Sequence, residues 1–317
     1  MFQIIAYLRF LLKSTNQHGV HSPFVYDLLT KCFYKKEKKP AFETIEKFRK
    51  ELLQDHRKIK VTDFGAGSRV FKSNERKVSD IAKNAGISKM RAILLNKLTS
   101  YFEIKSALEL GTSVGISSVA IAAGNKVNLT TLEGCPETAA VAREYFHLFK
   151  LGNINLEVGS FEEQLLVERG KWKVESGKDP QPPKGEQPPL PPKGEPNFLT
   201  PNPELQTRNL KPQTRNLQHT TYNKPETTNH KPQTTNLVFF DGNHQKEATL
   251  KYFNMLLPLA HNDSVFIFDD IHWSRGMEEA WEAIKDHPQV RVTIDSFYWG
   301  IVFFRKEQEK EHFIIRL

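Results

Sequence analysis

The chain contains acids and glycines at the ends of short apolar runs, where side chains of these types can bind ligands. The first run, 107–110, contains Glu109 and leads into the turn Gly111-Thr-Ser-Val-Gly115. A dinucleotide-binding turn would read G-x-G-x-x-G and would bring backbone N–H groups to a pyrophosphate. Here the glycine spacing is G-x-x-x-G, and the carboxylate of Glu109 would repel a pyrophosphate but attract a positively charged ligand. The turn therefore favours a cationic nucleotide over a dinucleotide.

A second acid lies where a ribose would be bound. The apolar run 127–133 ends in Glu133, and an acid at this place suits the two ribose hydroxyls in other nucleotide-binding α/β units. S-adenosylmethionine combines a ribose with an ammonium and a sulfonium. With these residues the chain resembles the class I S-adenosylmethionine-dependent methyltransferases, whose first motif is E/D-x-G-x-x-x-G and whose second strand ends in an acid. The resemblance implies that Glu133 binds the ribose and that Ser160 and Phe161, after the third predicted strand, border the adenine. It also implies that the methionine end is held by Glu109, Gly111, Thr112, Ser113, Gly115 and Ser117.

A second group of acids follows the next two predicted strands. The run 237–240 leads into Asp241-Gly-Asn-His244, and the run 264–268 leads into Asp269 and Asp270. The carboxyl ends of parallel strands meet at one crevice, so these side chains should converge. Three carboxylates without basic partners would repel one another, and a divalent cation bound by oxygens would relieve that repulsion. His244 reaches the same place and has an ordinary pKa suited to general-base catalysis.

The spacing D-x-x-H on one strand and D-D on the next resembles the metal-dependent O-methyltransferases, both the catechol type and the macrocin sugar type. The resemblance implies that Asp241, Asp269 and Asp270 bind Mg²⁺, that Asp241 also borders the cofactor, and that His244 is the base. Both residues of the second pair are Asp here, which departs from the Asn or Glu found in those families. Two alternatives stay open: acids that only cap strand ends, and a methyltransferase without metal. The segment 18–24 together with these motifs also resembles a group of uncharacterised bacterial methyltransferases.

The elements that must position these residues alternate between strand and helix patterns. They predict an α/β fold with a doubly wound, mostly parallel, seven-stranded Rossmann-like sheet, closed by a hairpin over 290–304, and segment 311–317 could add an edge strand. Residues 1–60 are expected to form a helical N-terminal extension, and 61–317 the methyltransferase domain. Asp63-Phe-Gly-Ala-Gly67 also places an acid before glycines, but no small-residue helix follows, so it is interpreted as a loop bordering the site or a turn.

Residues 171–236 interrupt the domain. They contain 13 of the 18 prolines, repeat short motifs and have no hydrophobic period, which indicates a disordered low-complexity insertion. Ten Lys or Arg and six Asp or Glu lie there, so half of the net charge of +8 belongs to the insertion and not to a phosphate-binding face. No nucleic-acid partner is therefore expected. The expected partner is a small molecule that accepts the methyl group.

The cysteines and the N-terminus bear on the cell compartment. Cys32 and Cys135 form no disulfide or metal pattern, which favours the cytoplasm. The apolar segment 1–12 is too short to span a bilayer and is expected to be an amphipathic helix packed on the body, with a membrane-surface helix as the alternative. Two other classes of function stay open, a nicotinamide-dependent oxidoreductase and a non-catalytic interaction protein that uses the insertion. The sequence leaves the oligomeric state undetermined.

Overall fold

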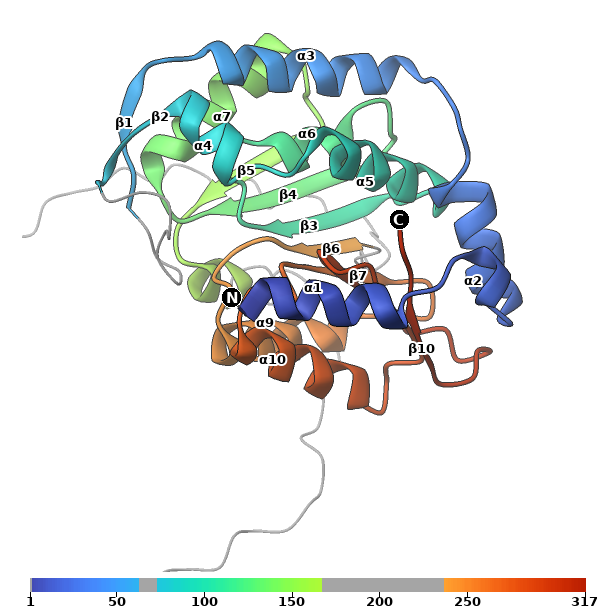
Figure 1. The fold of residues 1–317 in the computed structure, drawn as a ribbon. Helices are drawn as coiled ribbons and strands as arrows, with labels where there is room; N and C mark the ends of the chain where they lie inside the picture. The colour runs from blue at the N-terminus through green and yellow to red at the C-terminus, as the bar shows by residue number, and fades with distance from the viewer. Residues whose placement is uncertain (1, 63–72, 167–236) are drawn as a thin grey trace, which may run out of the picture.

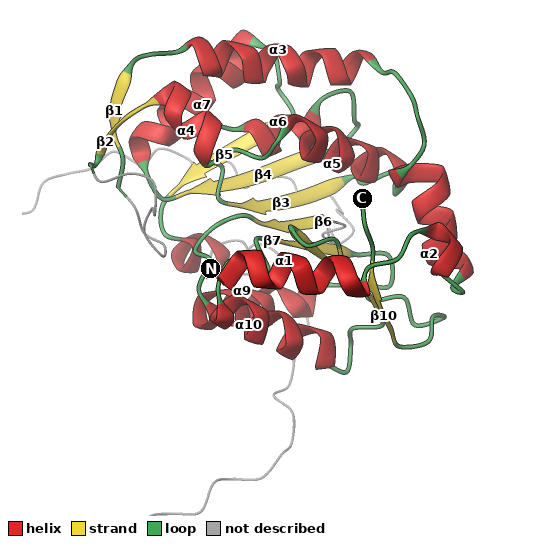
Figure 2. Cartoon of the chain, viewed as in Figure 1, coloured by secondary structure: helices red, strands yellow, loops and turns green. Residues whose placement is uncertain are grey.

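The computed structural model describes residues 2–62, 73–166 and 237–317. The predicted insertion and the second acid-glycine segment, Asp63 to Gly67, lie outside the described residues. Within the described part of the chain, an eight-stranded mixed sheet forms the centre of the molecule (Figure 2). Its strands run in the order β10-β8-β9-β7-β6-β3-β4-β5. The predicted doubly wound α/β fold is confirmed.

The strands coincide with the apolar runs of the sequence, and those at the centre of the sheet are buried on both faces. Every residue of β6, β7 and β9 is buried, as expected for strands covered by helices on both sides. The bounds are β3 Ser106–Leu110, β4 Asn128–Glu133, β5 Ile154–Val158, β6 Leu237–Phe240, β7 Val265–Asp269, β8 Val292–Asp295, β9 Trp299–Phe303 and β10 Glu311–Ile314.

Strand direction sets where the site can lie. β5, β4, β3, β6 and β7 are parallel, and β3 lies between β4 and β6, so the chain winds away from β3 in both directions. In doubly wound sheets such a reversal places the ligand crevice at the carboxyl ends of the two central strands, here β3 and β6. β8 and β9 form the predicted antiparallel hairpin, and β9 is antiparallel to β7. The sheet has eight strands rather than the expected seven because the C-terminal segment adds β10 beside β8.

Helices cover both faces of the sheet. Figure 1 shows α3, α5 and α6 above the sheet and α9 and α10 below it. Two hydrophobic clusters correspond to these layers, and the lower one brings Trp281 of α10 and Phe253 of α9 against the sheet. The bounds are α1 Phe2–Lys13, α2 Pro23–Leu28, α3 Pro40–Gln54, α4 Val78–Asn84, α5 Lys89–Tyr101, α6 Ile116–Ala122, α7 Pro136–Leu148, α9 Lys246–Leu256 and α10 Arg275–Asp286.

An N-terminal helical region, from α1 to the end of α3 at Gln54, precedes the sheet, as predicted. Ser22 caps α2 by accepting a hydrogen bond from the Val25 N–H, and Pro23 occupies the first helical position. A π-helical turn, Leu29–Phe33, continues α2, and α3 packs against α4, α5 and α6. A small antiparallel pair, β1 Lys58–Lys60 and β2 Glu75–Lys77, was not predicted.

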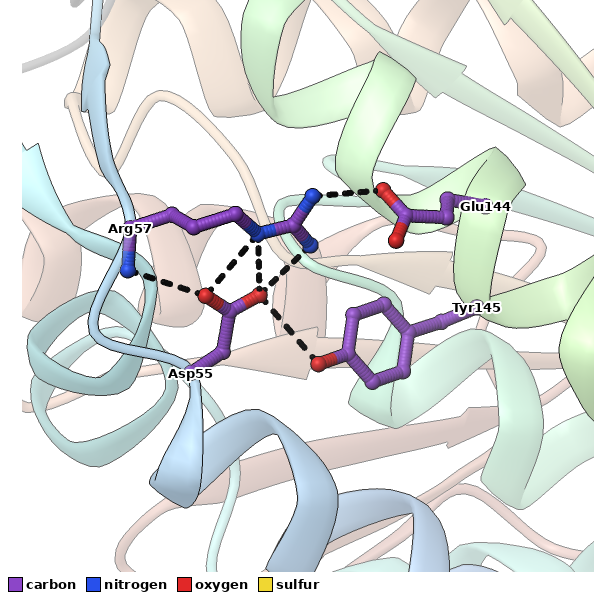
Figure 3. A network of polar contacts seen from close by, with 4 residues as sticks. All are labelled: Asp55, Arg57, Glu144 and Tyr145. Atoms are coloured by element: carbon purple, nitrogen blue, oxygen red, sulfur yellow. Dashed lines mark hydrogen bonds and ion pairs between the residues drawn. The ribbon is translucent and has the colours of Figure 1, made fainter.

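An ion-pair network joins the end of α3 to α7 (Figure 3). The Arg57 guanidinium donates to Asp55 at 2.6 Å and to Glu144 at 2.9 Å, and the Tyr145 hydroxyl donates to Asp55 at 3.2 Å. Burial works against ionisation of Asp55, but the hydrogen bonds from Arg57 outweigh it and lower the pKa of this carboxyl below its usual value. These contacts fix the helical extension to the sheet domain.

Candidate active site

The turn after β3 approaches the turn after β6 too closely for a side chain. Gly111 has a φ of +102°, and a Cβ atom there would collide with the main-chain carbonyl of Asp241. Gly115 has a φ of +87° and begins α6, and a Cβ atom there would lie 2.5 Å from the ring of Phe146. Both positions therefore need glycine, for backbone conformation and for space.

Glu133, at the end of β4, is bonded directly to this turn. Its Oε2 accepts the Ser113 N–H at 2.7 Å, and its Oε1 accepts the Cys135 N–H at 2.9 Å. Burial raises the pKa of Glu133 despite these bonds. The Thr138 hydroxyl and the Gly134 N–H also donate to this carboxylate. The glycine turn and the predicted ribose acid thus form one structural unit.

Glu109 lies behind the turn rather than in the crevice. It has no exposed surface, and its Oε2 accepts hydrogen bonds from the hydroxyls of Ser118 and of Thr131, the latter at 2.6 Å. Thr131 also bonds the hydroxyl of Thr112 at 2.6 Å. Burial, opposed by the surrounding hydroxyls, including that of Ser117, raises the pKa of Glu109 to about 7. Of the residues predicted to hold the methionine end, Glu109, Thr112 and Ser117 therefore form a buried network that supports the turn.

The acids after β6 and β7 do converge, as predicted. A hydrogen bond joins the carboxyls of Asp241 and Asp269, and burial, then the charge of Asp269, raises the pKa of Asp241 well above its usual value. Asp270 contributes to the same field and adopts a φ of +54°. The premise that these acids lack a basic partner is wrong, because the Arg91 guanidinium of α5 lies 3.1 Å from Asp269 Oδ1.

His244 lies to one side of this cluster. It lines a pocket of about 390 Å³ at the start of α9 and α10, together with Gln245, Lys246, Glu247, Trp273, Ser274, Gly276 and Glu279. Among residues 2–62, 73–166 and 237–317, no three His, Cys, Asp or Glu side chains are grouped so that they could hold a metal ion. Asp241, Asp269 and Asp270 are not among the residues that line this pocket.

At the end of β5, the predicted adenine side contains a cap and an aromatic wall. The Ser160 hydroxyl accepts the Glu163 N–H at 3.2 Å and so caps the helical turn at 161–166. The Phe161 ring packs against Gly242, where a Cβ atom would lie 2.7 Å from it, and against Tyr252 at 5.6 Å between ring centroids. Phe161 thus closes the crevice beside the turn after β6.

Backbone strain marks the same edge of the sheet. Among the described residues, six non-glycine residues have positive φ. Four lie in the turns after β3, β6, β7 and β8, at Ser113, Asn243, Asp270 and Phe297, and the other two, Glu103 and Lys150, lie before β3 and β5. Such conformations persist only where the surrounding structure requires them, and they concentrate at functional sites. The strained turns surround the crevice that holds Glu133 and Asp241.

A family model described as a methyltransferase domain matches residues 108–271, just over half of the chain. The chain belongs to this methyltransferase family. No protein with curated annotation matches it.

The fold of this methyltransferase is distantly similar to solved structures. The methyltransferase PaMTH1 of Podospora anserina, bound to SAH, has 13% identity and a TM-score of 0.49 over 90% of this chain and 97% of that one. The O-methyltransferase from Bacillus cereus in complex with SAH has 15% identity and a TM-score of 0.45 over 88% and 95%. TomG, an O-methyltransferase of Streptomyces achromogenes involved in tomaymycin synthesis and in complex with SAM, has 13% identity and a TM-score of 0.46 over 92% and 99%.

The site of the methyltransferase also contains residues that sequence reasoning missed. Besides its pair with Asp269, Arg91 lies over the ring of Tyr298 at 4.8 Å from the centroid. Arg91 sits in a helix before the first motif, so no spacing rule connects it to Asp269, which is 178 residues away. The one feature of the sequence that could have indicated Arg91 is its place in α5, the helix that precedes β3 and the glycine turn.

A second missed group follows β7. The two ring nitrogens of His272 contact Glu278 at 2.8 Å and Asp295 at 2.9 Å, and the ring stacks on Phe297. Burial opposes protonation, but the two carboxylates outweigh it and raise the pKa of His272. This group links the turn after β7 to the turn after β8 and so holds Tyr298 beside Arg91.

Proposed function

We propose that this methyltransferase uses S-adenosylmethionine to methylate an oxygen of a small molecule. The observation that carries the proposal is the bond between Glu133 and the Ser113 N–H, because it joins an acid suited to ribose hydroxyls to a turn that admits no side chain. The crevice lies at the point where the strand order reverses, which is where nucleotides bind in doubly wound sheets. A cationic cofactor also matches a site in which acids outnumber bases.

In this proposal the crevice residues divide the cofactor among them. Glu133 accepts hydrogen bonds from the ribose hydroxyls, and Phe161 provides an apolar wall for the adenine. Gly111, Ser113 and Gly115 allow the backbone to approach the methionine end, while the hydrogen-bonded pair of Asp241 and Asp269 borders it. Glu109, Thr112 and Ser117 hold the turn in shape from behind, and Ser160 fixes the start of the helical turn that carries Phe161.

The transfer itself is a displacement. The acceptor hydroxyl loses its proton to His244, its oxygen bonds to the methyl carbon, and the bond from that carbon to the sulfonium breaks. The products are the methyl ether, neutral S-adenosylhomocysteine and a protonated His244. Alignment of the two reactants supplies most of the rate in such a step, and a positioned base adds about 10²–10⁴-fold. His244 suits this part because it is half-buried and lines a pocket of about 390 Å³ that could admit an acceptor.

Mg²⁺ is not part of the proposed mechanism, because the donor set does not fit it as arranged. Asp269 is paired with Arg91, and it also shares a hydrogen bond with Asp241. A hard divalent cation needs several carboxylate oxygens free to turn toward it, and these two are already engaged. We propose that Arg91 supplies the positive charge that the three aspartates require.

The test is calorimetric titration of S-adenosylhomocysteine into the purified full chain, compared with Gly111→Ala. Wild type should bind, and the variant should lose binding by at least about a hundredfold, because a Cβ atom at 111 displaces the turn from Asp241. Gly152→Ala is the matched control, since nothing lies within 4 Å of a Cβ atom there. Its affinity should equal that of wild type.

Two outcomes would overturn the proposal. Equal binding by Gly111→Ala and Gly152→Ala would show that the turn does not hold the cofactor. Binding of NAD in place of S-adenosylhomocysteine would favour a nicotinamide-dependent oxidoreductase instead.

A further inference from the structure

The first helix presents an apolar stripe to the outside of the molecule. Ile4, Leu8 and Leu12 follow one another at the four-residue spacing that aligns side chains on one helix face, and they are 67%, 55% and 87% exposed. Ile5 extends the same surface and is also exposed. Figure 1 shows α1, in dark blue, at the front of the molecule. An apolar surface of this continuity marks a place where something docks.

α1 is fixed to the body by its other side. Ala6 and Phe10 are buried, and the Tyr7 and Phe10 rings contact Phe297 at 4.8 and 5.5 Å between centroids. The Arg316 guanidinium donates to the Leu11 carbonyl at 3.0 Å, which ties the end of α1 to the C-terminal segment. The stripe is therefore the outer face of a docked helix.

The charges beside the stripe select its partner. α1 contains Arg9 and Lys13, both exposed and four residues apart, and it contains no acid. Projected around a helix, these two side chains fall next to Leu12 and Ile5, along one flank of the stripe. Basic residues flanking an apolar face are typical of helices that lie in the interface of an anionic bilayer.

We propose that α1 binds the surface of membranes that contain anionic phospholipid, with Ile4, Leu8 and Leu12 inserted and Arg9 and Lys13 at the headgroups. A second copy of the chain fits less well, because two α1 helices face to face would bring four cations together without an acid from either helix. At twelve residues α1 is about 18 Å long, well short of the roughly 30 Å of a hydrocarbon core. No helix in the described ranges is long and apolar enough to cross a membrane. α1 therefore lies in the plane of the interface.

This surface adjoins the crevice but does not depend on the function proposed for it. α1 contacts Phe297, and the ring of the next residue, Tyr298, lies under the Arg91 guanidinium. Arg91 in turn forms the ion pair with Asp269. Membrane binding would hold this edge of the sheet near the lipid headgroups.

The test is flotation of the full chain with vesicles of equal parts phosphatidylglycerol and phosphatidylcholine, and with vesicles of phosphatidylcholine alone. Wild type should float with the anionic vesicles. The triple variant Ile4→Ser, Leu8→Ser, Leu12→Ser should remain in the soluble fraction. Arg9→Gln with Lys13→Gln should lower the partition coefficient on anionic vesicles by roughly thirtyfold, since each basic residue near such a surface contributes about fivefold.

Met90→Ser is the matched control, because Met90 is 78% exposed on α5 and is not part of the stripe. It should float like wild type. Each altered side chain is exposed, and an unchanged melting temperature confirms that the variants are folded. Equal flotation of wild type and the triple variant, or no flotation of wild type, would overturn the proposal. So would a wild-type dimer in sedimentation velocity that the triple variant converts to monomer while neither binds vesicles, because the stripe would then join two copies.

Discussion

Two polar networks of this molecule use similar residues in opposite ways. In the network of Figure 3, Arg57 makes several bonds to Asp55 and another to Glu144, and it lowers the pKa of Asp55. At the carboxyl edge of the sheet, Arg91 contacts Asp269, but burial and neighbouring charge leave the pKa values of Asp241, Glu109 and Glu133 raised. The first network consists of charges that are already compensated. The second network retains Asp241, Glu109 and Glu133, whose charges no cation compensates fully.

The difference separates a structural network from a functional one. Compensated ion pairs at a surface hold elements together and need no further partner. Buried acids with raised pKa values, set among strained turns, are unfavourable for the isolated chain, and a cationic ligand would relieve them. The extension network therefore anchors helices, and the carboxyl edge is the region that we propose binds the cofactor. Four substitutions test this difference between the two networks.

The largest effect is expected at His244. His244→Ala should lower the rate of methyl transfer to catechol or to a methyl glycoside by about 10²–10⁴-fold, because the acceptor proton loses its base. The affinity for S-adenosylhomocysteine should not change. His287→Ala is the control, since His287 packs on Phe253 away from the crevice. Formation of S-adenosylhomocysteine from S-adenosylmethionine gives the rate, and an unchanged rate in His244→Ala would remove His244 from the mechanism.

Glu109→Gln should change how stability depends on pH. The pKa of Glu109 is about 7 in the folded chain, against an ordinary value of 4.5, so between these values the folded chain binds more protons than the unfolded one. Its contribution to stability is complete below about pH 4.5 and falls as pH rises to 7, by about 3 kcal/mol in all. The glutamine variant has no carboxyl to ionise at this position, so its free energy of unfolding does not fall for this reason. Urea unfolding between pH 5 and 8 should therefore show the variant gaining on wild type as pH rises.

The control for this measurement is Glu51→Gln, at an exposed position on α3. It should run parallel to wild type across the same range. Parallel curves for Glu109→Gln would mean that the buried carboxyl is not titrating as the comparison requires.

Arg91→Gln should destabilise the fold by about 2 kcal/mol, because it leaves Asp269 and Asp241 buried without a cation. The same change should create measurable Mg²⁺ binding that wild type lacks, since the free carboxylates would then need a cation. Urea unfolding and calorimetric titration of Mg²⁺ measure the two effects. Arg57→Gln is the matched arginine, half-exposed in the Figure 3 network, and should cost less than about 1 kcal/mol. Saturable Mg²⁺ binding by wild type would restore the metal centre predicted from the sequence.

The smallest effect is expected at Asp55, with the opposite pH dependence to Glu109. The folded-state pKa of Asp55 lies below its ordinary value of 3.8, so its contribution is present above that pH and is lost as pH falls through the folded pKa. Asp55→Asn should be less stable than wild type at pH 7, by less than about 1 kcal/mol, and the gap should close in acid. Thermal unfolding at several pH values measures it. A gap that widened in acid would contradict the assignment.

Local rules predicted much of this molecule. Ser22-Pro23 begins a helix, Gly111 and Gly115 form the turn, and the apolar runs 107–110, 127–133, 237–240 and 264–268 each coincide with a strand. These features follow from backbone conformation and burial, which depend mainly on neighbours in the sequence. The small pair β1–β2 escaped prediction because its short charged segments carry no such pattern.

The methyltransferase fold and the convergence of Asp241 with Asp269 could be predicted from the order of strands and helices along the chain. Parallel strands put their ends at one edge wherever the rest of the chain goes. Only the tertiary structure decided what each acid does there. Glu109 and Glu133 both lie at the ends of apolar strands, yet Glu109 is buried among hydroxyls from β4 and α6, and Glu133 faces the turn. The role of a carboxyl depends on its burial and on the charges around it, and those are supplied by residues far away in the sequence, as Arg91 is to Asp269.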